Sequence, residues 1–124
     1  MKTSLYLIVG DAFLRSQKSK AIALDIEKKC GGSLNHQSFR LSETLLDTII
    51  ANARTLPFLV QGQIFYIHIS EKLKADEVDL LERYIANPGE GTCLIFEADG
   101  VEGHSELIKL VKGKGQVIVL AKEE

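Results

Sequence analysis

The sequence predicts an α/β domain in which helices cover both faces of a parallel sheet of about five strands. One observation is that short apolar runs alternate about five times with segments of helical periodicity along the chain. Parallel neighbours need crossover connections, so this alternation favours a parallel sheet. A second observation is that the first run, Leu5–Val9, is continuously apolar, as is typical of a strand buried on both faces. The length of 124 residues suits one domain, and we expect residues 1–124 to form it.

The first helix is expected over Phe13–Lys29, where apolar residues recur at helical spacing. Gly31 and Gly32 end it, because glycine readily adopts the left-handed conformation found at the ends of helices. The next strand, Leu34–Leu41, is more polar than the first, so we expect it near an edge of the sheet.

The second helix is expected to begin at Thr44, which can cap it, with Asp47 three residues further on. Its apolar face consists of Leu45, Leu46, Ile49, Ile50 and Ala53. The strand that follows, Ile64–Ile69, is rich in β-branched and aromatic residues, which favour extended backbone.

The last part of the chain continues the alternation. A helix over Ala75–Ala86 carries acidic residues in its first turn, where the helix dipole favours them, and an Asn-Pro-Gly sequence ends it. Thr92–Phe96 is the fourth expected strand. A short helix over Ser105–Lys112 is expected to end at Gly113 and Gly115, and Gln116–Leu120 forms the last strand.

The composition excludes several classes of protein. A net charge of −2 is too mild for the basic surface that nucleic-acid binding usually requires. Cys30 and Cys93 lie far apart without a C-x-x-C partner, and no histidine shows metal-ligand spacing, so we expect neither disulfide nor metal. Leu5–Val9 is too short for the core of a signal peptide. No apolar run approaches the ~18 residues of a membrane span. We therefore expect a cytoplasmic protein that has no membrane partner.

The turn after the first strand stands where many nucleotide-binding proteins carry a phosphate loop, G-x-x-x-x-G-K-[ST]. Gly10 matches the first glycine of that loop, but Arg15 occupies the position of the second. Ser16-Gln17 replaces the Lys-Ser/Thr pair, and Asp11 places a negative charge where it would repel a phosphate. Gly10 and Asp11 therefore mark a degenerate phosphate-loop position.

Two alternative functions depend on the end of the third strand. An ATPase usually carries an acidic residue there to hold magnesium, and a phospho-receiver domain needs an aspartate there. Here that strand ends His68-Ile69-Ser70, although Lys122 after the last strand fits the receiver pattern. A small nucleotide-binding protein and a receiver-like signalling domain are thus alternatives that lack their acidic residue.

The segment between the second helix and the third strand is unusually apolar. It contains Leu56-Pro57-Phe58-Leu59-Val60 in a row, whereas loops normally run over the surface and are polar. Either Phe58 or Leu59 folds back beneath the sheet as a plug, or the segment is an exposed wedge that enters a partner's pocket. Aromatic and aliphatic anchors in such pockets carry most of the energy of an interface.

Three stretches together resemble a known family. LYLIVGDAFLRSQ, ANARTLPFLVQGQIFYIH and LLERYIANPGEGTCLIFEA are similar, in order and spacing, to the N-terminal domain of the bacterial DNA polymerase III delta subunit, part of the clamp loader. That family typically shows a Gly-Asp turn, a Phe-Leu pair, an Ala-Arg-Thr-Leu-Pro stretch followed by an apolar pair, and Asn-Pro before the fourth strand. Here Gln61-Gly62-Gln63 replaces the basic residues that commonly open the third strand.

The resemblance implies a three-layer fold like that of RecA and AAA+ proteins, with strand order 5-1-4-3-2 and a degenerate nucleotide site. It implies no ATPase activity and no cofactor. It also implies that an apolar wedge enters a hydrophobic pocket of the sliding clamp and helps to open the ring during DNA replication. Carried onto this chain, the wedge consists of Leu56, Pro57, Phe58 and Leu59. Other clamp-loader subunits would be contacted through domains absent here, since we expect this chain to be a fragment, and DNA only indirectly.

Overall fold

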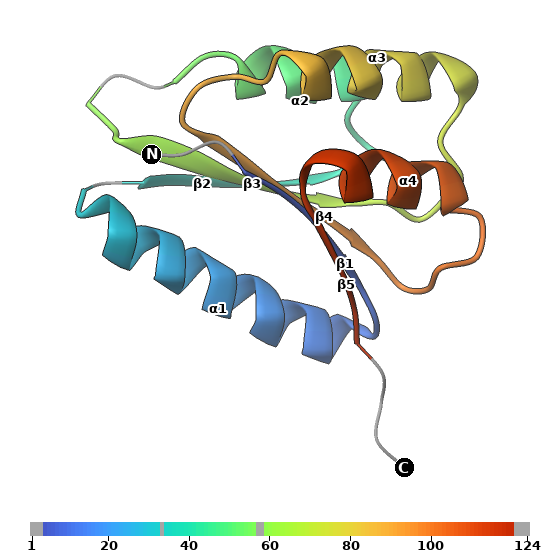
Figure 1. Cartoon of the computed structure of the whole chain (residues 1–124), viewed down its shortest axis with the longest axis horizontal. Helices are drawn as coiled ribbons and strands as arrows, with labels where there is room; N and C mark the ends of the chain where they lie inside the picture. Colours follow the sequence, from blue (N-terminus) through green and yellow to red (C-terminus); the bar gives the residue numbers. More distant parts are fainter. Residues whose placement is uncertain (1–3, 33, 57–58, 121–124) are drawn as a thin grey trace.

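The computed structural model describes residues 4–32, 34–56 and 59–120, and it has the expected α/β architecture (Figure 1). Strands and helices alternate from end to end. The elements are β1 (Ser4–Val9), α1 (Ala12–Cys30), β2 (Leu34–Arg40), α2 (Leu46–Ala53), β3 (Gly62–His68), α3 (Ala75–Ala86), β4 (Thr92–Ala98), α4 (Ser105–Lys114) and β5 (Gln116–Val119).

The strands form one sheet in the order β2-β3-β4-β1-β5, and every neighbouring pair is parallel. Read from the other edge, this is the 5-1-4-3-2 order implied by the resemblance, which is therefore confirmed. β2 is an edge strand, as its polar composition predicted. The register places Leu7 of β1 opposite Phe96 of β4, and Phe96 in turn lies opposite Ile67 of β3.

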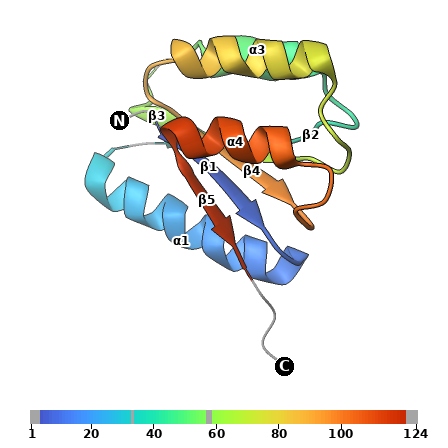
Figure 2. The same ribbon diagram turned by 45° about the vertical axis from the view of Figure 1, so that its right-hand side comes forward.

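Helices cover both faces of the sheet, which gives three layers. Figures 1 and 2 show α1 alone on one face and α2, α3 and α4 together on the other. Successive side chains of a strand point to opposite faces. In β1, Leu7 therefore packs in the larger core under α2, α3 and α4, whereas Ile8 packs in the smaller core against α1. Both residues are fully buried, which explains the continuous apolar run of this strand.

Two predicted helix boundaries are wrong. Thr44 does not cap α2: its backbone N–H donates to the carbonyl of Arg40 in a turn, at 2.9 Å. The residue at the cap position is Leu45, which has no side-chain oxygen to accept from the helix. Of the two glycines expected to end α4, Gly113 lies within the helix, whereas Gly115 follows its last turn as expected. Tertiary packing of Leu107 and Val111 against the sheet holds this helix despite the glycine.

The topology places the two candidate sites at opposite ends of the molecule. The β1–α1 turn follows a strand and lies at the carboxyl edge of the parallel sheet, whereas the α2–β3 loop precedes a strand and lies at the amino edge. Each helix runs antiparallel to the strands, so the helix C-termini gather at the amino edge (Figure 1). No helix in the described ranges is long and apolar enough to cross a membrane.

Candidate functional site

The turn at the degenerate phosphate-loop position is held by its own polar groups. The side chain of Asp11 is the N-cap of α1, and its Oδ1 accepts from the backbone N–H of Leu14 at 3.0 Å. The N–H of Gly10 donates to the carbonyl of Ala98 in β4 at 3.1 Å. Gly10 has φ of +155°, and a Cβ there would lie 3.0 Å from Leu120. The N–H groups of Gly10 and Leu14 are thus occupied by the protein itself, unlike those of a loop that wraps a phosphate.

Arg15 stands at the position of the missing second glycine, and its guanidinium lies at the carboxyl edge between the β1–α1 turn and the end of β4. The side chain is buried, and Nη1 donates to the carbonyl oxygen of Gly10 at 2.6 Å and to Oδ1 of Asp99 at 2.5 Å. Nε forms an ion pair with Oε1 of Glu97 at 3.5 Å. A phosphate group would bring negative charge to this edge, and here two carboxylates from the end of β4 already supply it.

The acidic residues of this cluster lie at the end of the fourth strand. The ATPase and receiver patterns instead expect an acidic residue at the end of the third strand. The hydrogen bond from Arg15 lowers the pKa of the Asp99 carboxyl. His68, at the end of β3, lies 3.7 Å from Asp99 through Nε2. The sequence does show acidic residues at the end of β4, Glu97 within it and Asp99 directly after it, but only the structure shows that both pair with Arg15. Lys122, the other receiver-like residue, lies outside the described residues.

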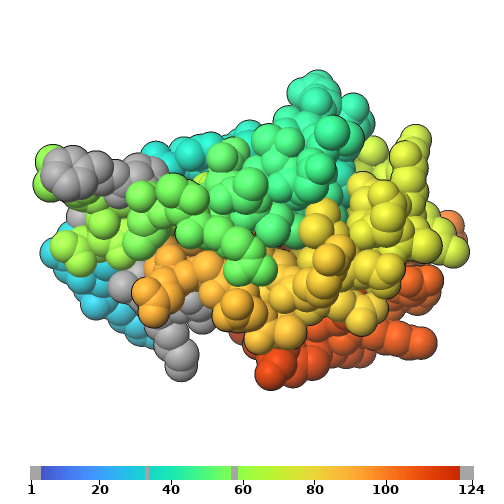
Figure 3. Space-filling model, turned by 90° about the horizontal axis from the view of Figure 1, so that it is seen from above, coloured from blue at the N-terminus to red at the C-terminus, as the bar shows by residue number. Residues whose placement is uncertain are grey.

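The apolar loop at the amino edge exposes a large hydrophobic side chain. Leu59 is 82% exposed, and its φ of 71° is a left-handed conformation that leucine rarely adopts. Leu59 is therefore not a plug beneath the sheet. Leu56 is 38% exposed, and Pro57 and Phe58 lie outside the described residues. In Figure 3 the loop lies at the left-hand end of the molecule, near the C-terminal ends of α2 and α3.

The base of this loop is anchored by two buried polar residues at the starts of β3 and β4. The Nε2 group of Gln63 lies 3.1 Å from the carbonyl oxygen of Asn52 and 3.2 Å from that of Thr55, so it can donate to both. The Thr92 hydroxyl donates to the carbonyl of Ala53 at 2.7 Å and lies 3.1 Å from the same Gln63 nitrogen. Gln63 and Thr92 are fully buried and satisfy carbonyls that the end of α2 leaves without helical partners.

Neither residue was identified as important from the sequence. In the sequence, Gln63 stands out only because the resemblance leads us to expect basic residues at the start of the third strand. A glutamine or threonine at the first positions of a buried strand gives no signal by itself, because its partners are main-chain atoms of another element.

A second set of contacts fixes the start of the loop against α3. The guanidinium of Arg54, the residue that follows α2, lies over the Tyr84 ring at 4.9 Å and donates to the carbonyl of Asn87 at 2.6 Å. Leu56 lies beside Gly91, where an added Cβ would come within 3.0 Å of its Cδ1 atom. The loop thus leaves a rigid base, and its exposed apolar side chain lies beyond that base.

Within the described ranges, no three His, Cys, Asp or Glu side chains come together as a metal site would require, and Cys30 and Cys93 are both free thiols.

Comparisons with known proteins agree with this fold. The sequence model of the family described as "DNA polymerase III, delta subunit" matches residues 6–121. No curated protein matches the chain. Among solved structures, the chain is similar to the Bacillus subtilis DNA clamp loader delta protein (YqeN), with a TM-score of 0.69 and 21% sequence identity. That match covers 97% of this chain and 39% of the other, so the chain spans well under half the length of that protein.

Proposed function

Because the chain belongs to the DNA polymerase III delta subunit family, we propose that it binds the sliding clamp through the α2–β3 loop and helps to open the ring. The observation that carries this proposal is the exposed Leu59 on an anchored base. A leucine held in the left-handed region costs on the order of 1–3 kcal/mol, and such strain clusters at functional sites. A partner's apolar pocket would cover the side chain that the domain leaves in water.

The energy available from the wedge is sufficient to shift a conformational equilibrium. Moving one leucine or phenylalanine from water into a pocket gains roughly 1.5–3 kcal/mol. A ligand shifts an equilibrium only by its preference for one state, so the wedge must fit the clamp better when one interface of the ring is open. The anchored base contributes because a pre-positioned loop loses little conformational freedom on binding.

We also propose that the domain is a scaffold that does not hydrolyse ATP. Arg15 and its two carboxylate partners occupy the edge at which a phosphate chain would lie in an active relative. The chain then acts as a non-catalytic part of the polymerase III holoenzyme. We propose that residues 1–124 correspond to the N-terminal domain of the delta subunit family.

The test is calorimetry of the chain with the sliding clamp of the same organism. We expect the double variant Phe58→Ala/Leu59→Ala to abolish detectable binding while its melting temperature stays within about 2 °C of the parent, as the proposed wedge requires, because substitutions of surface residues change stability little. Leu45→Ala is the matched control: Leu45 is 72% exposed, but it lies at the opposite edge of the sheet.

Unchanged affinity in the double variant would show that the loop is not the wedge. Thermal stabilisation of the parent chain by ATP and magnesium would instead support the nucleotide-binding alternative, and incorporation of label from a phosphodonor would support the receiver-like one.

A further inference from the structure

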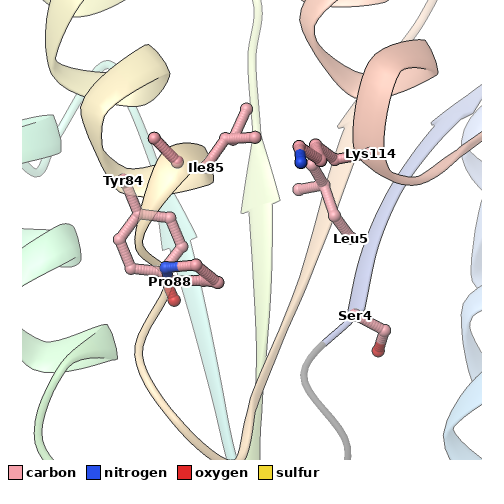
Figure 4. Close-up of a pocket in the computed structure, with 7 residues that line it drawn as sticks. Ser4, Leu5, Tyr84, Ile85, Pro88 and Lys114 are labelled. Carbon is pink, nitrogen blue, oxygen red and sulfur yellow. The ribbon is translucent and has the colours of Figure 1, made fainter.

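A cavity of about 250 Å³ opens at the amino edge of the sheet, close to the loop base. It lies between the start of β1, the C-terminal end of α3 and the C-terminal end of α4. Figure 4 shows its walls: Leu5 on one side, Tyr84 and Pro88 on the other, and Ile85 and Lys114 above. Three of these walls are aliphatic, and Lys114 adds a cation to the rim.

The cavity and the loop share one continuous surface. Tyr84, which lines the cavity, is the residue over which the Arg54 guanidinium lies at the start of the loop. The main chain from Asn87 to Gly91 leads from the cavity to Leu56, since Asn87 accepts from Arg54 and Gly91 lies beside the leucine. A partner that covered the base of the loop at Arg54 and Leu56 would therefore lie against the mouth of the cavity as well.

Acidic residues in the first turns of the helices and basic residues at the helix C-termini lie at opposite ends of the molecule. Acidic residues stand in the first turns of three helices, and these are Asp47, Asp76, Glu77 and Glu106. Basic residues stand in the last turns or just after them, and these are Lys28, Lys29, Arg54, Arg83, Lys112 and Lys114. Among the described residues, Lys29 of this basic set forms an ion pair, with Asp25, and the others have no carboxylate partner.

Helix dipoles explain why cations stand at the helix C-termini, but they do not compensate all of the positive charge at this end of the molecule. Each helix C-terminus carries about half a negative charge, which favours a nearby cation. α4 ends with two cations, Lys112 and Lys114, and Arg54 follows α2. In α3, Glu82 stands beside Arg83, and Glu90 is exposed between α3 and β4. These four cations therefore outnumber the two carboxylates, and Lys114 makes the rim of the cavity positive.

Building on the proposed function, we propose that this cavity is a second contact site for the sliding clamp, and that it binds an apolar side chain of the clamp flanked by a carboxylate. The aliphatic walls select the apolar group, and Lys114 pairs with the carboxylate. One inserted anchor leaves the domain free to rotate about the point of contact. A second anchor on the same rigid edge fixes the orientation, so that displacement of the domain is transmitted to the clamp.

The test is calorimetry of the chain with the clamp at several salt concentrations, using two variants that act differently. Ala86→Phe places a bulky ring at an exposed lining position and fills the cavity, and Lys114→Glu reverses the charge at its rim. We expect each to weaken binding roughly 10-fold, and Lys114→Glu to flatten the salt dependence. Lys109→Glu, exposed on the same helix but away from the cavity, is the matched control and should change affinity less than about 2-fold.

The possible results separate this inference from the proposed function. If the loop variant Phe58→Ala/Leu59→Ala loses binding while both cavity variants bind as the parent does, the second site is wrong and the wedge stands. If the parent chain does not bind the clamp, both are wrong. Self-association of the parent that Ala86→Phe abolishes in sedimentation would assign the cavity to a second copy of the chain and overturn the inference. Should Ala86→Phe not fold, Lys114→Glu decides alone.

Discussion

The anchoring role of Gln63 can be tested by changing the chemistry of its side chain at nearly constant volume. Gln63→Leu removes the amide, whereas Gln63→Glu replaces its nitrogen by an oxygen. The nitrogen lies within 3.2 Å of the carbonyl oxygens of Asn52 and Thr55 and of the Thr92 hydroxyl oxygen. The leucine variant therefore loses the donor, and the glutamate variant turns a carboxylate towards carbonyl oxygens.

The expected cost follows from these contacts. Two amide hydrogens make two net hydrogen bonds of about 1 kcal/mol each, and leaving a buried acceptor without a partner adds about 1–3 kcal/mol. Gln63→Leu should thus reduce the free energy of unfolding by roughly 2–4 kcal/mol. Gln63→Glu should cost more at pH 7, because a fully buried carboxylate without a cation is strongly disfavoured. Burial raises the folded-state pKa of that glutamate. The stability of the Gln63→Glu variant should therefore be greatest below the unfolded pKa of about 4.3 and should decrease as the pH rises through the folded-state pKa.

Urea unfolding followed by far-UV circular dichroism measures both effects, since the chain has no tryptophan for fluorescence. Gln116→Leu, at the exposed start of β5, is the control and should change the free energy of unfolding by less than about 0.5 kcal/mol. Amide exchange at residues 52–56 should rise in the Gln63 variants. A Gln63→Glu protein as stable as the parent at pH 7 would refute the reasoning, because it would mean that the amide nitrogen does not face these oxygens.

Two further predictions concern the carboxyl edge and the thiols. Arg15→Ala should reduce the free energy of unfolding by about 1.5–3 kcal/mol in urea titrations, since it removes the buried guanidinium that donates to the Gly10 carbonyl and pairs with Glu97. Because the pKa of Asp99 is lowered in the folded parent, its contribution to stability is present above the unfolded pKa of about 3.9 and is lost as the pH falls. The Arg15→Ala variant lacks this contribution, so its stability should fall less steeply in acid than that of the parent. Equal acid sensitivity of the two proteins would contradict this prediction. Burial raises the pKa of the Cys93 thiol to about 11, so a thiol reagent at pH 8 should label Cys30 alone in the native chain, and rapid labelling of both would show that β4 is accessible.

The fold could be predicted because its signals are local and repeated. The apolar run of β1, the aromatic and β-branched β3 and the helical spacing in α3 each define one element without reference to the others. The strand order could not be read from periodicity, and it came from the resemblance. The error at Thr44 has a physical reason: the hydroxyl suited a cap, but the preceding turn already used that residue's backbone, and packing of Leu46 at the core decided where α2 begins.

The chemistry of the two edges was harder to predict because it depends on long-range pairs. Arg15 and Asp99 are 84 residues apart in the sequence, and only the parallel pairing of β1 with β4 brings them together. The sequence showed that the phosphate loop was degenerate, but it did not show what replaced it. In the same way, the apolar loop was evident from its composition, whereas the two buried residues that anchor it were not.

The proposed function separates two ends of the sheet: the turn at the carboxyl edge, which we propose is not an ATPase site, and the apolar loop at the amino edge. At the carboxyl edge of the sheet, the first N–H groups of α1 lie close to the ends of β1 and β4. These N–H groups have no partner within the helix and need one from outside it. In an active relative a bound phosphate supplies the negative charge, and removing it would leave these groups unpaired. Here Arg15, Glu97 and Asp99 balance their charges within the chain. Under the proposed function, the amino edge would present its apolar loop without a bound nucleotide, and we expect any ATP dependence of clamp binding to come from other subunits.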